Sequence, residues 1–398
     1  MKCKITNEEI EPFMSFGKMP AANGFLDKKD FKNETFYNME VGFSKKTSLF
    51  QLNKFSNPKI IHSANYPFYT ASSEYMKTHF KKYADWVQKE YLKSNSKLIE
   101  VGSNDGTFLK NFIKTNIDYL GFEPSQTVAN QATKNNVKTI NAFFNEENVH
   151  DLKNFINKTD VICAANVICH IPNLKDVIKS IDYLLSKKGV FVFEEPYLGS
   201  MFKRVSYDQI YDAHVFIFSI HSVRSIFRTF GFDLIDAIKQ KTHGGSMRYV
   251  IARSGERKIN KKIYKIINYE KKLKLNKISS CLKFKKNCEI SKKKFIKKIM
   301  FYKRNGKSIA GYAASAKSST VFNYCNIGPN IIDYIADSTK EKIGKYSPGK
   351  HIPVKSIDFF RKNSTDVAIL CSWNHKKEII QKEKKFKKNG GIWITHVK

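Results

Sequence analysis

The 398-residue sequence predicts an α/β protein built around a doubly wound, mainly parallel sheet. Two observations predict this fold class. Between residues 97 and 253, short apolar runs such as KLIEV, DVICAAN and GVFVFEEP alternate with segments of helical spacing. A second, shorter alternation over residues 307–398 indicates another α/β domain. Because 41% of the residues are hydrophobic, the chain can bury real cores, which excludes a disordered polycation.

Four segments follow one another along the chain. Residues 1–70 mix Pro, Asn and Gly with short apolar runs, which predicts a small, irregular β module. A Ser start and helical spacing over 72–92 predict a helix that opens the domain 71–255. Residues 256–304 repeat Ile, Leu and Phe at three- and four-residue steps among lysines, which predicts a basic amphipathic helical connection. Residues 305–398 form the last domain.

The net charge of +34 is spread over the whole chain and comes mainly from Lys. Because no contiguous Arg and aromatic surface is visible, we expect no nucleic-acid partner. No apolar run approaches the roughly 18 residues of a membrane span, and the N-terminus lacks a signal-peptide core. We therefore expect a cytoplasmic protein without a membrane partner, as a monomer or simple homo-oligomer. The seven cysteines show no CxxC spacing, so neither disulfides nor a thiolate metal site is predicted.

Cofactor chemistry is expected in the loops at the carboxyl ends of the strands. The loop Gly102-Ser103-Asn104-Asp105-Gly106 follows strand KLIEV and precedes a predicted helix, and the next strand ends at Glu123, where a carboxylate can bind a ribose diol. Asp105 would repel a pyrophosphate but could accept a hydrogen bond from an ammonium group. S-adenosylmethionine, an adenosine cofactor that ends in an amino acid, fits these residues better than a dinucleotide. The candidate cofactor residues are Gly102, Asn104, Asp105, Gly106, Glu123, Pro124 and Ala165.

Several motifs together resemble one family: EVGSNDGTFLKNF, GFEPS, NVICHIPN, FEEPYL, YDQIYDAHVFIFS, HGGSMR, GYAASAKSSTVFNYC, KYSPGKHIPV and CSWNHKKEI. In this order they resemble the S-adenosylmethionine-dependent sugar C-methyltransferases, which act on nucleotide-linked keto-deoxysugars. The resemblance covers nearly the whole chain. It implies a small zinc-binding N-terminal module, a class I methyltransferase sheet and a C-terminal Rossmann-like α/β domain that helps to hold the sugar nucleotide.

The sequence departs from the family's zinc-binding pattern. The four cysteine positions of the family are occupied here by Cys3, Thr6, Ser44 and Thr47. One thiol with three hydroxyls is not the soft, tetrahedral ligand set that structural zinc requires. We therefore expect the N-terminal module to fold by packing, without a metal ion.

The resemblance also implies the reaction and its residues. Carbon 3 of a sugar becomes acidic when carbon 4 is a ketone, and a base must remove its proton before a methyl group is transferred. His214 matches the family's general base, and Tyr211 lies where it could bind the sugar. Asn166 and His170, in the loop after DVICAAN, could bind the enolate oxygen or exchange a proton, although His170 could also cap a helix.

The motif around His214 is incomplete. The family's Glu is replaced by Ala213, and its neighbour Asp212 is a poor substitute because adjacent side chains of an extended segment point to opposite faces. Methylation of an oxygen or nitrogen of a sugar nucleotide therefore stays open as an alternative.

Residues for the sugar nucleotide are expected in three places. Tyr66 or Tyr69 falls where the family has a tyrosine over the substrate, although both could be packing residues. Arg248, beside a glycine turn, could meet an anion or simply belong to a hairpin. In the last domain, Lys317 belongs to a segment that follows a strand and opens a helix, a plausible phosphate cradle. The remaining candidates at this edge of the second sheet are Asp337, Tyr346 and His351.

Overall fold

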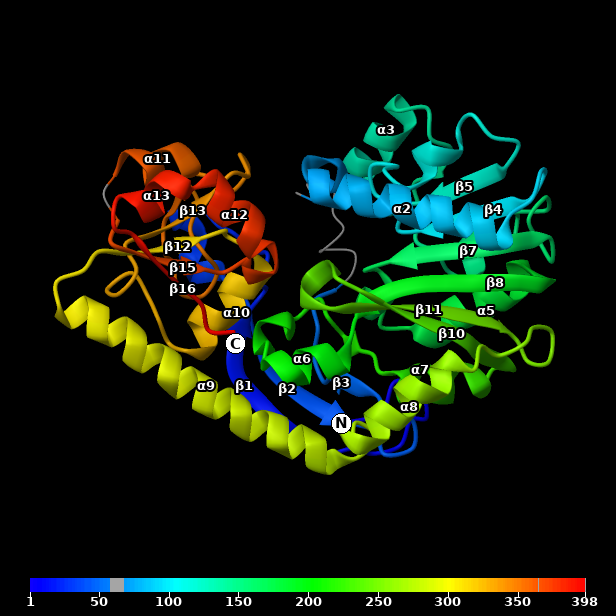
Figure 1. Ribbon diagram of the computed structural model, residues 1–398, viewed down its shortest axis with the longest axis horizontal. Helices are drawn as coiled ribbons and strands as arrows, with labels where there is room; N and C mark the ends of the chain where they lie inside the picture. The colour runs from blue at the N-terminus through cyan, green and yellow to red at the C-terminus, as the bar shows by residue number, and fades with distance from the viewer. Residues whose placement is uncertain (58–67, 364, 398) are drawn as a thin grey trace.

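Figure 1 shows a computed structural model of the chain, which describes residues 1–57, 68–363 and 365–397. Two α/β lobes lie side by side, and a long helix, α9 (Ile278–Arg304), runs along the lower edge of the molecule beneath the smaller lobe. One candidate substrate residue, Tyr66, lies outside the described residues.

The larger lobe contains a seven-stranded sheet with the order β10-β11-β8-β7-β4-β5-β6. Strands β6, β5, β4, β7 and β8 are parallel, whereas β11 pairs antiparallel with both β8 and β10. The first strand of the chain in this sheet, β4, lies between β5 and β7, so the strand order reverses beside it. The bounds are β4 (Lys97–Val101), β5 (Asp118–Phe122), β6 (Thr139–Ile140), β7 (Thr159–Ala165), β8 (Leu185–Pro196), β10 (Phe232–Gln240) and β11 (Ser246–Arg253).

Both faces of this sheet are buried, as expected for a doubly wound fold. Leu98 packs in the core under α2 (Glu74–Tyr91), whereas its neighbour Ile99 packs in the core of the opposite face with α5 (Leu174–Leu184) and α7 (Ile220–Arg228). The predicted α/β fold class is therefore confirmed. The helix expected directly after the glycine loop differs: residues 109–112 form only a short 3-10 helix, η3 (Leu109–Phe112).

The smaller lobe contains a five-stranded sheet in which every strand pair is parallel, with the order β14-β13-β12-β15-β16. Its strands are β12 (Ile309–Tyr312), β13 (Tyr334–Asp337), β14 (Val354–Ser356), β15 (Val367–Leu370) and β16 (Ile392–Ile394). Its helices are α10 (Ala316–Tyr324), α11 (Ile357–Lys362), α12 (Lys376–Lys382) and α13 (Lys384–Lys388). Two helices, α8 (Lys262–Lys272) and α9, connect the lobes.

The N-terminal residues form an antiparallel sheet that is shared with the rest of the chain. Its order is β1-β2-β3-β9, and the fourth strand, β9 (Phe216–Ile217), comes from the sequence of the larger lobe rather than from the N-terminus. The other strands are β1 (Pro12–Pro20), β2 (Phe36–Phe43) and β3 (Phe50–Leu52). Their apolar side chains pack in one core with α9 and the smaller sheet, so the N-terminal strands connect the two lobes.

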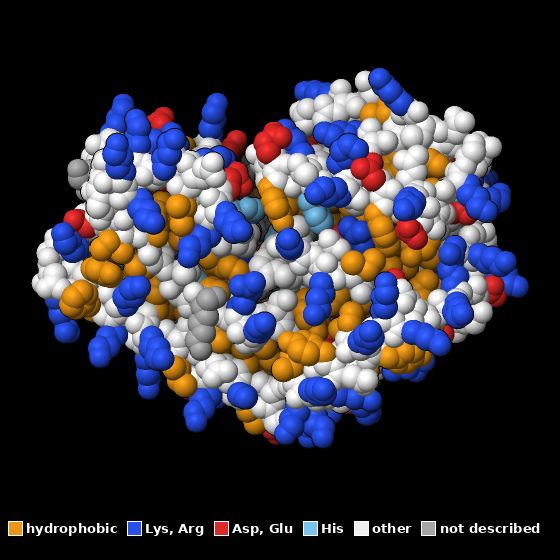
Figure 2. Space-filling model, in the orientation of Figure 1, with side chains coloured by type: hydrophobic (Ala, Val, Ile, Leu, Met, Phe, Trp, Pro, Cys, Tyr) orange, Lys and Arg blue, Asp and Glu red, His pale blue; other side chains and the backbone are white. Residues whose placement is uncertain are grey.

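Lys and Arg side chains are scattered over the visible face of the molecule rather than gathered in one patch (Figure 2). Histidine side chains are visible in the hollow between the two lobes. Among the described helices, none combines the length and apolar character that a membrane span requires.

Candidate active site

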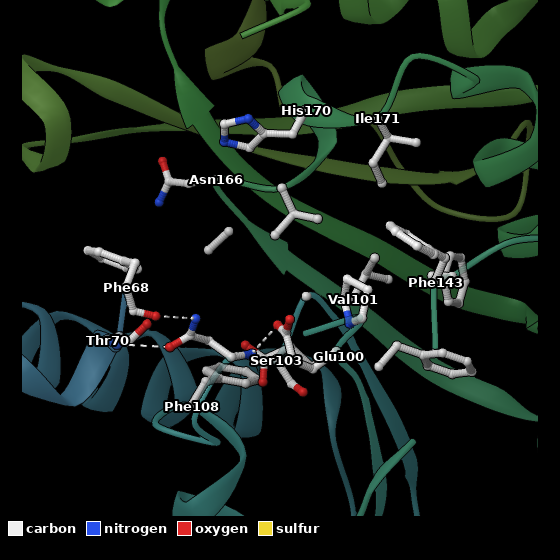
Figure 3. Close-up of a pocket in the computed structure, with 18 of the residues that line it drawn as sticks. Phe68, Thr70, Glu100, Val101, Ser103, Phe108, Phe143, Asn166, His170 and Ile171 are labelled. Atoms are coloured by element: carbon white, nitrogen blue, oxygen red, sulfur yellow. Dashed lines mark hydrogen bonds between the residues drawn. The ribbon is translucent and has the colours of Figure 1, made fainter. Parts of the chain in front are cut away.

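A cavity of about 560 Å³ opens at the carboxyl ends of β4, β5 and β7. Its walls come from the loops after these strands, from the start of α2, and from His375 of the smaller lobe. Figure 3 shows Asn166 and His170 on one side of the cavity and Phe143 on another. The volume lies within the range of pockets for small ligands and cofactors.

Two glycines shape the loop after β4; Gly102 lines the cavity, whereas Gly106 does not. Gly102 and Gly106 have positive φ angles of 67° and 78°, which favour glycine. A Cβ atom on Gly102 would lie 2.4 Å from Cγ2 of Val167, and one on Gly106 would lie 2.7 Å from Cγ2 of Val137. The loop after β4 therefore packs against neighbouring loops only because these side chains are absent.

Two carboxylates line the cavity beside this loop. Glu123 accepts hydrogen bonds from the backbone amides of Asn104 (3.0 Å) and Ser125 (2.8 Å), and burial raises its pKa. Glu100 was not predicted as a site residue. It is buried on β4, its Oε2 has no hydrogen-bond partner among the described residues, and burial raises its pKa well above the ordinary range, helped by the nearby carboxylates. A buried acceptor without a partner suits a ligand that brings a hydrogen-bond donor or a positive charge.

Asp105 and Asn104 hold another segment of the chain. The carboxylate of Asp105 accepts hydrogen bonds from the amide of Ala71 (2.8 Å) and the hydroxyl of Thr107 (2.6 Å), and it does not line the cavity. The side chain of Asn104 accepts from the amide of Thr70 (2.8 Å) and donates to the carbonyl of Phe68 (3.1 Å). Asp105 was expected to face the ammonium group of a ligand. In the structure its oxygens instead accept hydrogen bonds within the protein, one of them from the segment before α2.

Asn166 and His170 line the cavity where the loop after β7 turns. Asn166 adopts a left-handed backbone (φ 58°), and its side-chain oxygen is buried without a partner among the described residues. Nδ1 of His170 lies 2.7 Å from the carbonyl oxygen of Ala213. A carbonyl only accepts, so Nδ1 carries the proton and Nε2 of the neutral ring is an acceptor. Burial lowers the pKa of His170, which favours this neutral form.

His214 lies behind His170, with 4.9 Å between the ring centroids, and is not a cavity-lining residue. Its Nδ1 donates to the carbonyl of Gln209 (2.7 Å), so Nε2 accepts the hydroxyl hydrogen of Tyr211 at 2.5 Å. Burial, together with the neighbouring His170, lowers the pKa of His214 well below its ordinary value. The two histidines are therefore both neutral and both carry an unprotonated Nε2.

The residues between Tyr211 and His214 form a turn rather than an extended strand. Asp212 points to the N-terminal sheet, where its carboxylate accepts from the amide of Ala22 (2.9 Å) and from the hydroxyl of Ser56. Asp212 therefore does not replace the carboxylate that is missing at Ala213.

Arg248 occupies a different place from the one expected. Its guanidinium is buried, pairs with Glu194 at 2.5 Å, and stacks over the rings of Tyr83 (4.1 Å) and Trp86 (4.5 Å). Glu194 also contacts His79 at 2.6 Å. Arg248 thus neutralises a buried carboxylate under α2 and does not line the cavity.

The hydroxyls at the start of α10, where a phosphate cradle was expected, have partners within the protein. Ser315 and Ser318 cap each other in a capping box, and the buried side chains of Ser319 and Thr320 donate to the carbonyls of Ala22 and Ile210.

The other candidates of the smaller lobe are also paired within the protein. Asp337 accepts from the amides of Ala314 (2.6 Å) and Thr339 (2.7 Å), which organises a turn. The ring of His351 stacks on Phe31 at 3.7 Å, and Tyr346 meets the edge of the same ring. These three residues, and Tyr69 near the start of α2, do not line the cavity. Lys317 donates to Oδ1 of Asn374 at 3.1 Å and lies beside the cavity wall formed by the smaller lobe.

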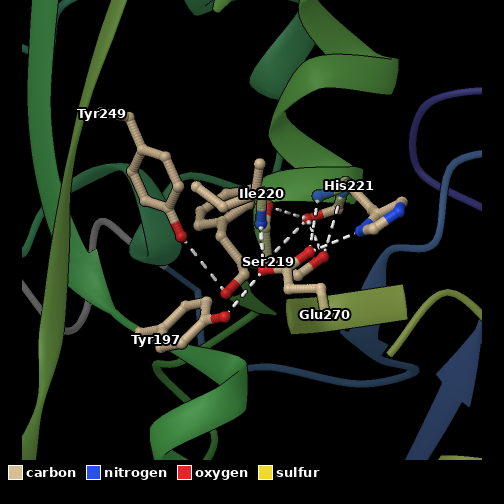
Figure 4. Close-up of polar contacts among 8 residues, drawn as sticks. Tyr197, Ser219, Ile220, His221, Tyr249 and Glu270 are labelled. Atoms are coloured by element: carbon tan, nitrogen blue, oxygen red, sulfur yellow. Dashed lines mark hydrogen bonds and ion pairs between the residues drawn. The ribbon is translucent and has the colours of Figure 1, made fainter. Parts of the chain in front are cut away.

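The segment that carries His214 is anchored from behind by one buried carboxylate, shown in Figure 4. Glu270 of α8 accepts hydrogen bonds from the hydroxyl of Tyr197 (2.9 Å) and from the amides of Ile220 (2.7 Å) and His221 (3.0 Å). Its Oε2 also lies 2.5 Å from Nδ1 of His221. Glu270 therefore fixes the first turn of α7, which begins six residues after His214.

The residues at the family's zinc positions do not fit that metal. Cys3 is buried beside the hydroxyls of Thr6 and Ser44. Burial raises the pKa of its thiol, but hydrogen bonds from these neighbours have a larger combined effect and leave the pKa below its ordinary value. The hydroxyl of Ser44 donates to the carboxylate of Glu8 and accepts from the amide of Thr47 (3.2 Å). One thiol with three hydroxyls is not the soft, tetrahedral ligand set of a structural zinc site, and the hydroxyl of Ser44 is already hydrogen-bonded.

Comparisons with known proteins agree with this architecture. A zinc-binding domain family model matches residues 3–62, a methyltransferase domain model matches 74–237, and a model of the C-methyltransferase C-terminal domain matches 241–397. C-methyltransferase NovU of Streptomyces niveus is 26% identical over 400 residues, which cover 100% of this chain and 95% of that protein.

Solved structures of methyltransferases resemble part of the chain. Magnesium protoporphyrin IX methyltransferase from Synechocystis, with bound S-adenosylmethionine, has a TM-score of 0.35 and 12% identity, over 45% of this chain and 79% of its own. A methyltransferase from Thermotoga maritima has a TM-score of 0.33 and 15% identity, over 43% and 88% of the two chains.

The sheet order, the glycine loop and the family models define a methyltransferase that depends on S-adenosylmethionine. The domain order and the full-length similarity resemble those of C-methyltransferases, and the model of their C-terminal domain matches residues 241–397. The cavity residues fit the cofactor, because the glycine loop admits close approach and the walls carry unpaired or lightly paired acceptors for a positively charged ligand.

Proposed function

We propose that this enzyme transfers a methyl group from S-adenosylmethionine to carbon 3 of a nucleotide-linked 4-keto-deoxysugar. The observation that carries the proposal is the pair of neutral imidazoles, His170 and His214, beside Asn166 of the cavity wall, whose side-chain oxygen has no partner among the described residues and whose amide nitrogen can donate. The resemblance of the motifs to sugar C-methyltransferases and the similarity to C-methyltransferase NovU support the same chemistry.

In the proposed complex, Glu123 binds the ribose hydroxyls of the cofactor and Glu100 receives its ammonium group. The chemistry that S-adenosylmethionine supplies when bound is an electrophilic methyl group on a sulfonium ion. Glu100 lies beside the glycine loop with a free Oε2, and Glu123 can exchange its backbone partners for hydroxyl groups. Gly102, Pro124 and Ala165 line the same part of the cavity and shape it around the cofactor.

The substrate proton on carbon 3 is removed by the histidine pair. We assign the base role to His214, whose ring is fixed by Gln209 and whose Nε2 carries no proton. Because the hydroxyl of Tyr211 occupies that nitrogen, it must turn to the substrate as the sugar binds. His170 reaches the cavity directly and binds the sugar, and the amide of Asn166 donates to the developing enolate oxygen.

The alternative is methylation of an oxygen or nitrogen of a sugar nucleotide by the same fold. One observation favours it: among the described residues, no carboxylate takes the position of Ala213, because Asp212 is turned to Ala22 of the N-terminal residues. A neutral histidine suffices to deprotonate a hydroxyl or amine during transfer.

We further infer that the enzyme acts in the cytoplasm without a nucleic-acid or membrane partner, and that its substrate is the intact sugar nucleotide. The test of the proposed function is turnover against a panel of nucleotide-linked 4-keto sugars, with mass spectrometry and carbon NMR of the products. A new carbon–carbon bond at carbon 3 supports the proposal, whereas a methyl group on oxygen or nitrogen establishes the alternative.

A further inference from the structure

Strand β8 carries two adjacent carboxylates near its end, and they point to opposite faces of the larger sheet. Glu194 faces α2, where it pairs with Arg248 and His79. Glu195 is fully buried, and the hydrogen bonds that it accepts from described residues come from the loop after β7, which includes the turn η4 (Ile168–His170). Because α2 and this loop both line the cavity, the two acids hold two different walls of it.

The loop after β7 carries Asn166 and His170, which both line the cavity (Figure 3). Oε1 of Glu195 accepts hydrogen bonds from the amides of Val167 (3.0 Å) and Cys169 (3.2 Å), which lie between these two residues in the sequence. Both amides belong to the start of η4, and amides at the start of a helical turn have no acceptor within it. Glu195 therefore acts as a capping residue, from a neighbouring strand, for the turn that ends at His170.

The position of this loop is fixed closely on both sides. Asn166 adopts a left-handed backbone (φ 58°), and its amide donates to the carbonyl of Glu194 (2.8 Å). On the other side, Val167 packs directly against Gly102 of the loop after β4, where no Cβ atom would fit. A shift of the loop would therefore move the side chains of Asn166 and His170 and also disturb the loop after β4.

Glu195 is a costly residue to bury. Burial raises its pKa to about 7, and the hydrogen bonds from the amides of Cys169, Val167 and Ile168 oppose this rise. Its second oxygen, Oε2, is buried without a hydrogen-bond partner among the described residues. The phenol of Tyr249 and the thiol of Cys169 face the carboxylate, and burial raises the pKa of both, so neither brings a compensating charge. A carboxylate buried at such a cost is typical of a functional position rather than of packing.

We propose that Glu195 is a positioning residue for methyl transfer. Its carboxylate holds the loop after β7 so that Asn166 and His170 face the reacting atom of the substrate. Glu195 does not line the cavity, so it acts only through this loop. The inference rests on the proposed function, because the roles of Asn166 and His170 are part of that function. A displacement of about 1 Å in such a loop is enough to slow a reaction about 100-fold.

Three substitutions at position 195 separate the reach of the side chain from its charge. Glu195→Gln keeps the length of the side chain and an oxygen that accepts hydrogen bonds. Glu195→Asp keeps the carboxylate but is one methylene shorter, so the loop must shift to reach it. Glu195→Ala removes the acceptor. The matched control is Val192→Ala, because Val192 is fully buried on the same strand but packs in the core under α2, so its truncation destabilises the fold without touching the loop.

The first measurement is amide hydrogen exchange by mass spectrometry over residues 164–172, which requires no methyl acceptor. Glu195→Asp and Glu195→Ala should lower the protection of this loop by about 10-fold or more, the effect of a lost hydrogen bond to a charged group. Glu195→Gln should lose clearly less, and Val192→Ala should keep the wild-type protection. If Glu195→Ala does not fold, the comparison of Glu195→Asp with Glu195→Gln decides. Wild-type protection in Glu195→Asp would overturn the inference.

The second measurement is steady-state kinetics with S-adenosylmethionine and a nucleotide-linked 4-keto sugar that wild type methylates. Glu195→Asp should lower kcat about 100-fold, and Glu195→Gln should restore most of it. The KM for S-adenosylmethionine should stay close to that of wild type, because the proposed cofactor contacts of Glu100 and Glu123 come from other strands. A kcat in Glu195→Asp no lower than that of Val192→Ala, or a larger loss in Glu195→Gln than in Glu195→Asp, would overturn the inference.

These results separate the positioning role from the proposed function. If Glu195→Asp loosens the loop but methylates the keto sugar with the wild-type kcat, the positioning role is refuted and the proposed function stands. If wild type methylates an oxygen or nitrogen instead, methylation at carbon 3 is refuted. The same kinetic comparison, made with that acceptor, then supports or refutes the role of Glu195.

Discussion

Glu270 is the residue whose removal should most clearly disturb the support of the active site. In Glu270→Ala, the amides of Ile220 and His221, the ring of His221 and the hydroxyl of Tyr197 all lose their acceptor in a buried place. Removing one partner of a buried charged network costs about 3–5 kcal/mol. Because Glu270 holds the first turn of α7, we expect this loss to appear first as local opening of that helix.

The assay is amide hydrogen exchange measured by mass spectrometry over residues 216–230. A loss of about 3 kcal/mol lowers protection there roughly 150-fold. Glu270→Gln should lose less, because its amide oxygen still accepts from Tyr197 and Ile220. Glu289→Ala on the exposed side of α9 is the control, and it should leave exchange of α7 unchanged. Wild-type protection of α7 in Glu270→Ala would refute the anchoring role.

Three further predictions follow from the cofactor site, the buried acids and the N-terminal module. Glu123→Ala should weaken the binding of S-adenosylmethionine by about 1.5–3 kcal/mol, as measured by calorimetry, and an unchanged affinity would contradict the ribose contact. Burial raises the pKa of Glu195 from 4.5 to about 7. Between these two values the folded protein retains a proton that the unfolded chain releases. The contribution of Glu195 to the free energy of unfolding is therefore complete below about pH 4.5 and falls as the pH rises toward 7. Glu195→Gln should flatten the decline of melting temperature between pH 5 and 8; a slope equal to that of wild type would count against this. Metal analysis of untagged protein should find far less than one zinc per chain, whereas stoichiometric zinc that resists a chelator would show that other ligands hold it.

The larger sheet and the cofactor loop could be predicted because their signals are local. Gly102 and Glu123 directly follow two apolar strands and lie about twenty residues apart in the sequence. A parallel sheet brings the ends of such strands together. Glu100 could have been predicted in the same way, because a charged residue inside an otherwise apolar strand is rarely buried without a partner or a ligand.

The contacts that were not predicted join residues far apart in the sequence. Asp105 holds Ala71, 34 residues away, and Asp212 holds Ala22, 190 residues away. No local pattern shows that these carboxylates are already paired, so a motif position alone suggested ligand contacts for Asp105. Likewise, His243 and His375 face one cavity only because two lobes meet there.

The central claim is removal of a proton from carbon by the histidine pair, and solvent deuterium exchange tests it most directly. The 4-keto sugar nucleotide that supports turnover is incubated in D₂O with enzyme and S-adenosylhomocysteine, and exchange at carbon 3 is followed by NMR for wild type, His214→Asn and His170→Asn. We predict exchange by wild type and its loss, by roughly 100-fold to 10,000-fold, in His214→Asn, because a positioned general base contributes that factor. Exchange that persists in His214→Asn but disappears in His170→Asn would transfer the base role to His170. Methyl transfer by wild type without exchange at any carbon would contradict carbon methylation itself.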